Sequence, residues 1–245
     1  MLNLRWNQIA FGALILIFSA AGFAQAQRKE RKATVLRLMD YDTKSLHYGF
    51  QIGVFSSNLN TRYSDFFLNS AESSDSTLSI SSRRGTSFSL GFVINKSLSD
   101  ELWDVRLLPS VAFYSYAVDY YFPDRTVTQL VNNTSTFVEL PIVFKYRSVR
   151  RKNVRMYLIG GIAPGLGVGS KRLQEDPQGL GLNNFNCEIT YGVGLEGYMQ
   201  LFSFAPELRF SHGFINMRKP ADNNFSRNLD RLTTHKIGLY FNFEG

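Results

Sequence analysis

The chain has 245 residues and a formal net charge of +7, and 44% of its residues are hydrophobic. Cys187 is the only cysteine, which excludes an intramolecular disulfide framework. Two short basic runs, 28–32 and 147–152, hold many of the cations. A basic balance can indicate nucleic acid binding, but an exported chain rarely meets nucleic acid, so we expect no such partner.

The N-terminus has the pattern of an export signal. Arg5 precedes an apolar stretch over 9–21, and Ala24, Gln25 and Ala26 form an A-x-A cleavage pattern. The stretch is too short for a transmembrane helix. We expect residues 1–26 to be a cleaved signal peptide, which lowers the net charge to +6 because Arg5 is the only charge removed. An uncleaved membrane anchor is the alternative.

The rest of the chain alternates apolar and polar residues. Residues 27–45 are a polar, basic lead-in, which we expect to be a periplasmic segment. The first strand is expected over 47–58, where Tyr48, Phe50, Ile52 and Val54 share one side. Seven more are expected at 85–95, 102–119, 136–146, 154–169, 186–198, 204–212 and 234–243.

The connections between these segments are alternately long and short. Eight amphipathic strands of about ten residues joined in this way are typical of an outer-membrane barrel. We predict an all-β fold over residues 46–245: an eight-stranded antiparallel transmembrane β-barrel with up-and-down meander topology. The prediction puts the N-terminus and the short turns in the periplasm of a bacterium, the wall in outer-membrane lipid and the four long loops outside.

Four prolines fall inside the expected strands: Pro109, Pro141, Pro164 and Pro206. Proline cannot donate a hydrogen bond to a strand ladder, so we expect bulges at these positions. If the prolines instead break the strands, a soluble sandwich becomes the better interpretation.

The inward positions carry five acids and five bases. By strand parity these are Asp104, Glu139, Glu188, Glu196 and Glu207, with Arg106, Lys145, Arg155, Arg209 and Lys236. An eight-stranded barrel is only wide enough for its own side chains to fill. Because unpaired buried ions are costly, we expect a plug of salt bridges. A proton or solute pathway is the alternative.

The three histidines are the candidate residues for a catalytic site. His47 falls near the periplasmic end, whereas His212 and His235 fall at the outer ends of neighbouring strands and could approach each other. Their parity places them on the lipid side or at the loop boundary. Since the chain contains neither a G-x-S-x-G elbow nor an H-E-x-x-H pair, we expect no enzyme and no catalytic residue.

Metal and cofactor sites have little support in the sequence. One cysteine and three scattered histidines form no ligand spacing. Asp65, Glu72 and Asp75 lie in a loop without a calcium-binding pattern, so we interpret them as solvated. We predict no metal site and no cofactor.

The basic turn around Arg147, Arg150, Arg151 and Lys152 is the candidate contact surface. A run of like charge is typical of a solvated turn or an interaction surface. In the periplasm it would face an acidic protein partner or the phosphates of the inner leaflet.

Several segments resemble the PorT family of outer-membrane barrel proteins. These are 39–42 with 47–50, 106–109, 138–141 with 145–146, and the residues Arg147, Ser148, Arg151, Asn153, Arg155 and Tyr157. One departure is the C-terminus, where Glu244 and Gly245 follow Phe243 in place of a terminal aromatic residue. The resemblance implies an accessory role in type IX secretion through protein contacts, without being the main pore. A structural or adhesin-type barrel whose long loops bind surface ligands is the alternative.

Overall fold

The computed structural model describes residues 36–38, 41–42, 44–69, 79–98, 102–115, 117–121, 126–129, 135–168, 182–219 and 228–245. The expected signal peptide over 1–26 and most of the lead-in lie outside these residues. Within the described part, no helix combines the length and the hydropathy of a membrane span.

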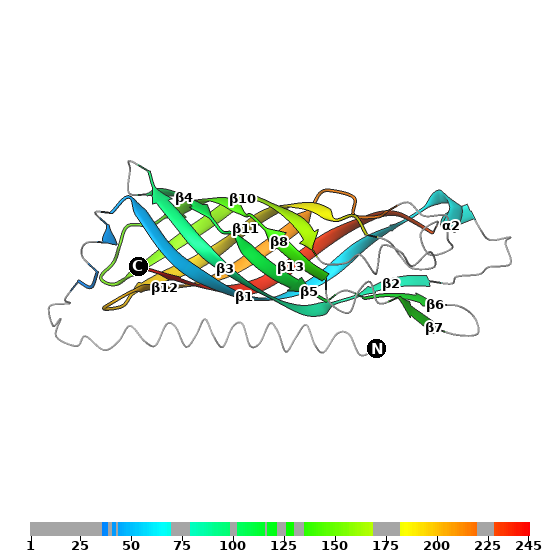
Figure 1. The fold of residues 1–245 in the computed structure, drawn as a ribbon, viewed down its shortest axis with the longest axis horizontal. Helices are drawn as coiled ribbons and strands as arrows, with labels where there is room; N and C mark the ends of the chain where they lie inside the picture. The colour runs from blue at the N-terminus through cyan, green and yellow to red at the C-terminus, as the bar shows by residue number, and fades with distance from the viewer. Residues whose placement is uncertain are drawn as a thin grey trace, which may run out of the picture. The chain divides into compact units, whose positions relative to one another are not determined.

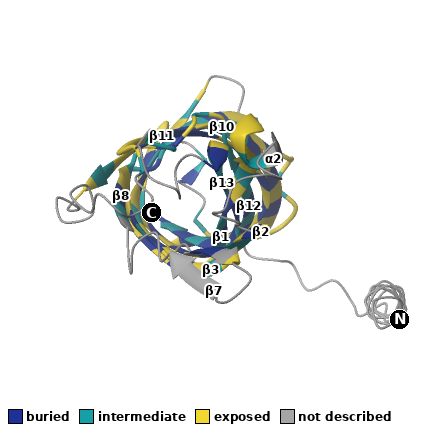
Figure 2. Ribbon diagram, turned by 90° about the vertical axis from the view of Figure 1, so that its right-hand side faces the viewer, coloured by how far each residue is buried: buried dark blue, intermediate teal, exposed yellow. Residues whose placement is uncertain are grey.

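Ten strands form one closed antiparallel sheet (Figures 1 and 2). They are β1 (Leu46–Tyr63), β3 (Gly85–Ser97), β4 (Trp103–Leu107), β5 (Ser110–Tyr114), β8 (Ser135–Glu139), β9 (Ile142–Arg147), β10 (Val154–Val168), β11 (Phe185–Tyr198), β12 (Ser203–Gly213) and β13 (Leu229–Glu244). β4 with β5, and β8 with β9, are the two halves of single interrupted strands, so the ring has eight members. It closes where β1 pairs with both β13 and β3. The predicted eight-stranded meander is confirmed.

Pro109 and Pro141 interrupt their strands without shifting the register. Leu107 pairs with Ile142 before the interruption, and Ser110 pairs with Glu139 after it, so both strands advance by three residues. The expected bulges are therefore wrong at Pro109 and Pro141. The neighbouring strands instead donate hydrogen bonds to the proline carbonyls, since proline can still accept a hydrogen bond. The amide of Phe92 donates to Pro109 O at 2.9 Å. The amide of Leu108 donates to Pro141 O at 3.0 Å, and the amide of Leu140 donates to Pro164 O at 2.9 Å.

Pro164 and Pro206 lie within continuous strands, where they are paired with Cys187 and Phe241. A register shift in the described β1–β13 ladder occurs elsewhere, between Arg62 and Tyr63.

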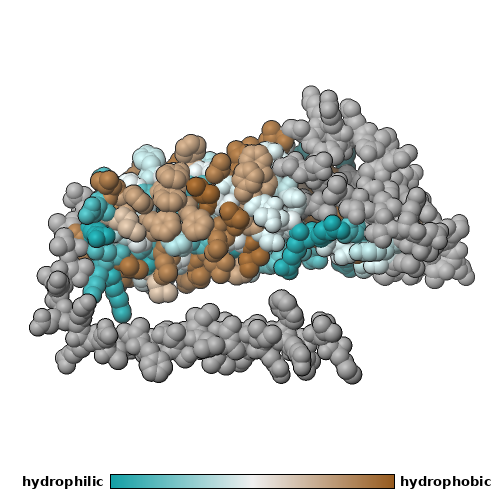
Figure 3. Space-filling view, turned by 90° about the horizontal axis from the view of Figure 1, so that it is seen from below, coloured by the Kyte–Doolittle hydropathy of each residue, from teal (hydrophilic) through white to brown (hydrophobic). Residues whose placement is uncertain are grey.

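The two faces of the ring differ as the alternation predicts. Outward apolar residues are exposed and inward polar residues are buried (Figure 2). The exposed fraction of Phe92, for example, is 70%. Apolar residues gather over the middle of the wall (Figure 3). This exposed apolar belt is the surface that a barrel presents to lipid.

The loop end of the barrel, opposite the short turns, is more structured than predicted. β1 extends to Tyr63, and β13 begins at Leu229, beyond the ends expected from alternation. Two long loops supply a three-stranded sheet of β2 (Ser79–Arg83), β6 (Ala117–Tyr121) and β7 (Thr126–Gln129), and α2 (Asp65–Asn69) follows β1 (Figure 1). The expected third strand, 102–119, therefore ends in the barrel at Tyr114. The loop-end cluster of buried apolar residues is Phe55, Leu59, Ile80, Ala112, Tyr114, Val118, Phe137, Met217, Leu229, Leu232 and Tyr240.

Candidate functional site

The interior near the short turns holds eight charged side chains, which we call the turn-end network. It comprises Asp104, Glu196, Glu207 and Glu244 with Arg106, Lys145, Arg147 and Arg209. Alternation along β4, β9, β11, β12 and β13 points them all to the same side of the wall. Four carboxylates and four cations make the network formally neutral.

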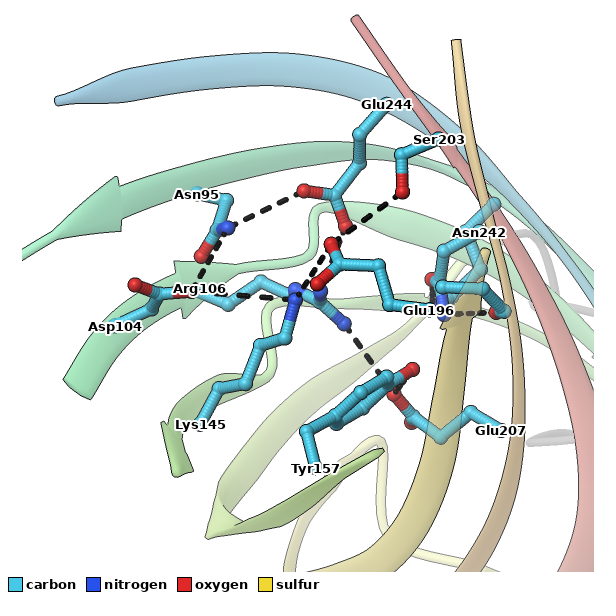
Figure 4. Close-up of polar contacts among 12 residues, drawn as sticks. Asn95, Asp104, Arg106, Lys145, Tyr157, Glu196, Ser203, Glu207, Asn242 and Glu244 are labelled. Carbon is cyan, nitrogen blue, oxygen red and sulfur yellow. Dashed lines mark hydrogen bonds and ion pairs between the residues drawn. The ribbon is translucent and has the colours of Figure 1, made fainter. Parts of the chain in front are cut away.

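Arg106 occupies the centre of the network (Figure 4). Its guanidinium lies 2.6 Å from Glu244 Oε1 and 3.3 Å from Glu207 Oε2, and all three side chains are 0% exposed. Tyr157 donates a hydrogen bond to Glu207 at 3.0 Å. One guanidinium is thus shared between two fully buried carboxylates. Its removal would leave Glu244 without a counter-ion and Glu207 with Arg209 alone.

The remaining ion pairs differ in the strands that they join. Arg147 is 2.9 Å and Lys145 Nζ is 3.9 Å from Asp104, which connects the neighbouring strands β9 and β4. Lys145 Nζ is also 3.2 Å from Glu196 on β11, which is not a neighbour of β9 in the sheet. The guanidinium of Arg209 is 2.5 Å from Glu207 on the same strand, β12. The turn-end network therefore crosslinks several strands at this end of the barrel.

The lead-in contributes a residue to this network. Tyr41, which is 3% exposed, donates hydrogen bonds to Glu244 at 3.0 Å and Glu196 at 3.3 Å and stacks on His47 with ring centroids 3.8 Å apart. Burial, together with the adjacent Glu244 and Glu196 carboxylates, raises the pKa of the Tyr41 phenol. Tyr41 therefore remains a neutral donor that covers the network at the turn end.

Asp42 fastens the same segment from the rim. Its carboxylate is 3.1 Å from Arg150 and 3.0 Å from Arg155. Arg150 also lies over the ring of Tyr198, with 3.9 Å between the guanidinium carbon and the centroid. The lead-in residues that the structure describes are thus held by the barrel itself.

A second, smaller group of charges lies farther along the interior. Lys236 Nζ is 2.6 Å from Glu188 and 3.0 Å from Glu139, and it donates to the Tyr114 hydroxyl. Thr234 donates to Glu188 at 2.8 Å. This group adjoins the loop-end cluster through Tyr114.

All ten predicted inward charges are confirmed as interior. Nine are buried, and Glu139 is 12% exposed. The prediction missed Glu244, Arg147 and Tyr41. Parity along β13 could have found Glu244, which is an even-numbered residue like Lys236 and Asn242. No periodic signal marks Tyr41, because the lead-in has none.

The basic turn is divided by the fold. Arg147 and Arg150 turn toward Asp104 and Asp42, whereas Arg151 and Lys152 are exposed at the tip. Lys152 has a φ of 59°, and the amides of Arg151 and Val154 bond each other's carbonyls across a two-residue turn.

His212 and His235 do approach each other, as their positions predicted. Their Nδ1 atoms are 2.9 Å apart, and the Tyr191 hydroxyl is 3.0 Å from Nε2 of His212. The three lie on the outward face at the loop end. His47 is instead buried against Tyr41, so the structure does not bring the three histidines together.

Candidate metal ligands do not cluster in the part of the chain that the structure describes. Among the residues that it describes, no group of three or more His, Cys, Asp or Glu side chains could hold a metal ion. Asp65 is exposed in α2, and Glu72 and Asp75 lie outside the described residues.

One family model and several solved structures are similar to the chain. The family model described as outer membrane protein beta-barrel domain matches residues 23–219. One similar solved structure is OprG from Pseudomonas aeruginosa, with 12% identity and a TM-score of 0.43 over 82% of this chain and 95% of that one. A second is Neisserial surface protein A, with 10% identity and a TM-score of 0.40 over 81% of this chain and 96% of that one. A third is the outer membrane enzyme PagL, with 12% identity and a TM-score of 0.38 over 78% of this chain and 97% of that one. No curated protein matches the chain.

Proposed function

Since the chain belongs to the outer membrane protein beta-barrel domain family, which places it in the bacterial outer membrane, we propose that it acts through contacts at its rims rather than by conducting a solute. The observation that carries this proposal is the turn-end network, whose neutral, fully buried ion pairs occupy the interior at the turn end. A path there would have to break these contacts, and any ion left buried without its partner would cost several kcal/mol.

The specific role that we propose is that of an accessory component in type IX protein secretion. The support is the resemblance of several segments to the PorT family, together with the exposed Arg151 and Lys152 at the tip of the basic turn. In this proposal the N-terminus and the short turns face the periplasm, and the turn tip contacts an acidic surface of the secretion machinery.

Gene deletion tests this role. Type IX cargo should accumulate in the periplasm as unprocessed precursor, and a plasmid copy of the wild-type gene should restore release. Normal cargo release in the deletion strain would refute the secretion role. Crosslinking followed by pull-down from outer membranes, with the wild type and with Arg151→Gln/Lys152→Asn, then identifies partners that depend on the tip.

The second candidate is a structural or adhesin-type barrel. The observation in its favour is the sheet of β2, β6 and β7, because an ordered loop platform can present a fixed binding surface. Replacing residues 79–83 and 117–129 with short Gly/Ser linkers separates the two candidates. Lost surface binding after the replacement supports the adhesin-type role. Intact export supports the first candidate, because that role depends on the turn tip at the opposite end of the barrel.

A further inference from the structure

The outer wall of the barrel carries an apolar groove of about 640 Å³. It crosses β10, β11, β12 and β13 on the half nearer the short turns. Its lining residues are Tyr146, Ser148, Met156, Tyr157, Leu158, Val193, Gly194, Leu195, Pro206, Glu207, Leu208 and Leu239.

The groove coincides with a gap in the β11–β12 ladder. Gly194 pairs with Glu207, and the next pair is Gly197 with Phe204, so Leu195 and Glu196 have no ladder partner on β12. Pro206 lies in this gap and has no amide hydrogen to donate. Its short ring faces outward between longer side chains, which leaves the wall hollow there.

The rim of the groove is shaped by exposed apolar side chains. Met156 is 64% exposed, Leu158 54%, Val193 50% and Leu195 47%. A flexible hydrocarbon chain is the occupant that buries such a surface without needing hydrogen bonds.

One end of the groove leads directly to the basic turn. Ser148 and Met156 both line the groove, and they are bonded to each other: Ser148 N donates to Met156 O at 2.8 Å, and Met156 N donates to Ser148 Oγ at 3.1 Å. Arg151 lies three residues beyond Ser148, about 10 Å along an extended chain.

The tip of that turn has two cations directed away from the barrel interior. Arg151 and Lys152 are exposed, and within the described part of the chain neither forms a salt bridge. Arg147 and Arg150, by contrast, are paired with Asp104 and Asp42. The charge that remains at the tip is therefore positive and available to an anion beside the groove.

We propose that the groove and the turn tip together bind one anionic phospholipid. A hydrocarbon tail occupies the groove, and the headgroup phosphate lies against Arg151 and Lys152. The combination of an apolar groove with cations at one end identifies the occupant, because it matches a hydrocarbon tail joined to an anionic headgroup. The inference goes beyond the proposed secretion role and uses only its orientation, with the short turns at the periplasmic leaflet.

Native mass spectrometry of the purified full chain in detergent tests the inference. The probes are phosphatidylglycerol, which is anionic, and phosphatidylethanolamine, which is zwitterionic, with identical tails. Arg151→Gln/Lys152→Asn removes both charges while Asn tolerates the left-handed backbone at 152. Val193→Trp fills the groove. The matched controls are Lys96→Gln and Phe92→Trp on β3, which are also exposed.

The wild type should bind phosphatidylglycerol more tightly than phosphatidylethanolamine. The double charge variant should weaken phosphatidylglycerol binding about 30-fold and leave phosphatidylethanolamine unchanged, since each surface cation contributes about 1 kcal/mol, which is about fivefold in affinity. Val193→Trp should reduce binding of both lipids, and both control variants should bind like the wild type. A retained β-sheet circular dichroism signal confirms that each variant is folded.

Three results would overturn the inference. Equal affinity of the wild type for the two lipids would show that the headgroup makes no specific contact with Arg151 and Lys152. Unchanged lipid affinity in Val193→Trp would show that the groove does not hold the tail. A dimer that dissociates in Val193→Trp, without bound lipid, would assign the groove to a second copy of the chain. Because these measurements use purified protein and added lipid, failure of the secretion proposal would leave them unchanged.

Discussion

The two ends of the barrel interior are closed by different physical means. At the turn end, four buried carboxylates pair with four buried cations, and Tyr41 covers them. At the loop end, the closure is an apolar core made by barrel strands and loop segments together. The first closure depends on each ion keeping its partner, whereas the second depends on shape and volume.

This contrast teaches where the molecule tolerates change. A buried ion pair is weak evidence for stability, yet breaking one member is strongly destabilising. Truncating a side chain in an apolar cluster lowers the free energy of unfolding in proportion to the atoms removed and the volume of the cavity that remains. The four predictions that follow test this difference, from the largest expected effect to the smallest.

Replacing the central guanidinium should have the largest effect. Arg106→Met should lower the free energy of unfolding by about 3–5 kcal/mol, because Glu207 and Glu244 lose a shared counter-ion in a buried site. Urea unfolding in lipid vesicles measures the loss. Adding Glu244→Gln should recover part of it, and a double variant no more stable than Arg106→Met would contradict the predicted coupling.

Truncation in the loop-end cluster should cost less. Leu232→Ala should lower the free energy of unfolding by about 3 kcal/mol, since Leu232 is 0% exposed. The same unfolding assay applies. Combined with Arg106→Met, the losses should add to within about 0.5 kcal/mol because the two sites share no partner. Strong non-additivity would show that the two closures are one unit.

Removal of the Tyr41 hydroxyl should have a moderate, pH-dependent effect. Tyr41→Phe should cost about 1–2 kcal/mol near neutral pH, because two buried carboxylates lose a donor. The raised pKa of Tyr41 means that its contribution is complete below the ordinary value of 10.0 and is lost as the pH rises above it, where the unfolded phenol ionises first.

The unfolding free energies of the wild type and Tyr41→Phe should accordingly converge above about pH 10. Measurement of both proteins across this range, with tryptophan fluorescence as the signal, checks the prediction. A difference that stays constant with pH would mean that the Tyr41 phenol has the same pKa in the folded and the unfolded chain, contrary to the stated cause.

The smallest effect is expected in the loop sheet. Arg83→Ala should cost about 0.5 kcal/mol, since the side chain of Arg83 is 63% exposed in its 2.8 Å pair with Asp119. Urea unfolding again gives the value, and Arg83→Lys should lie closer to the wild type. A loss as large as that of Arg106→Met would refute the distinction between solvated and buried pairs.

Much of the barrel could be predicted from alternation alone. Period-two segments assign each residue to the wall or to the interior, so all ten inward charges and the outward faces of eight strands followed from parity. The proximity of His212 and His235 followed from strand order in the same way. The family resemblance added the expectation of a secretion role, which stays a proposal.

What the sequence by itself determined is therefore the wall: strand number, facing and the demand that interior charges pair. Only the tertiary structure decided which ions pair, because partners such as Arg106 and Glu244 are 138 residues apart and meet only when the ring closes. It also decided that Tyr41 joins the network and that Arg150 turns inward, since these contacts depend on distance in space and leave no period in the chain. The loop sheet and the groove have the same origin: each is assembled from segments whose local sequence carries no sign of its neighbour.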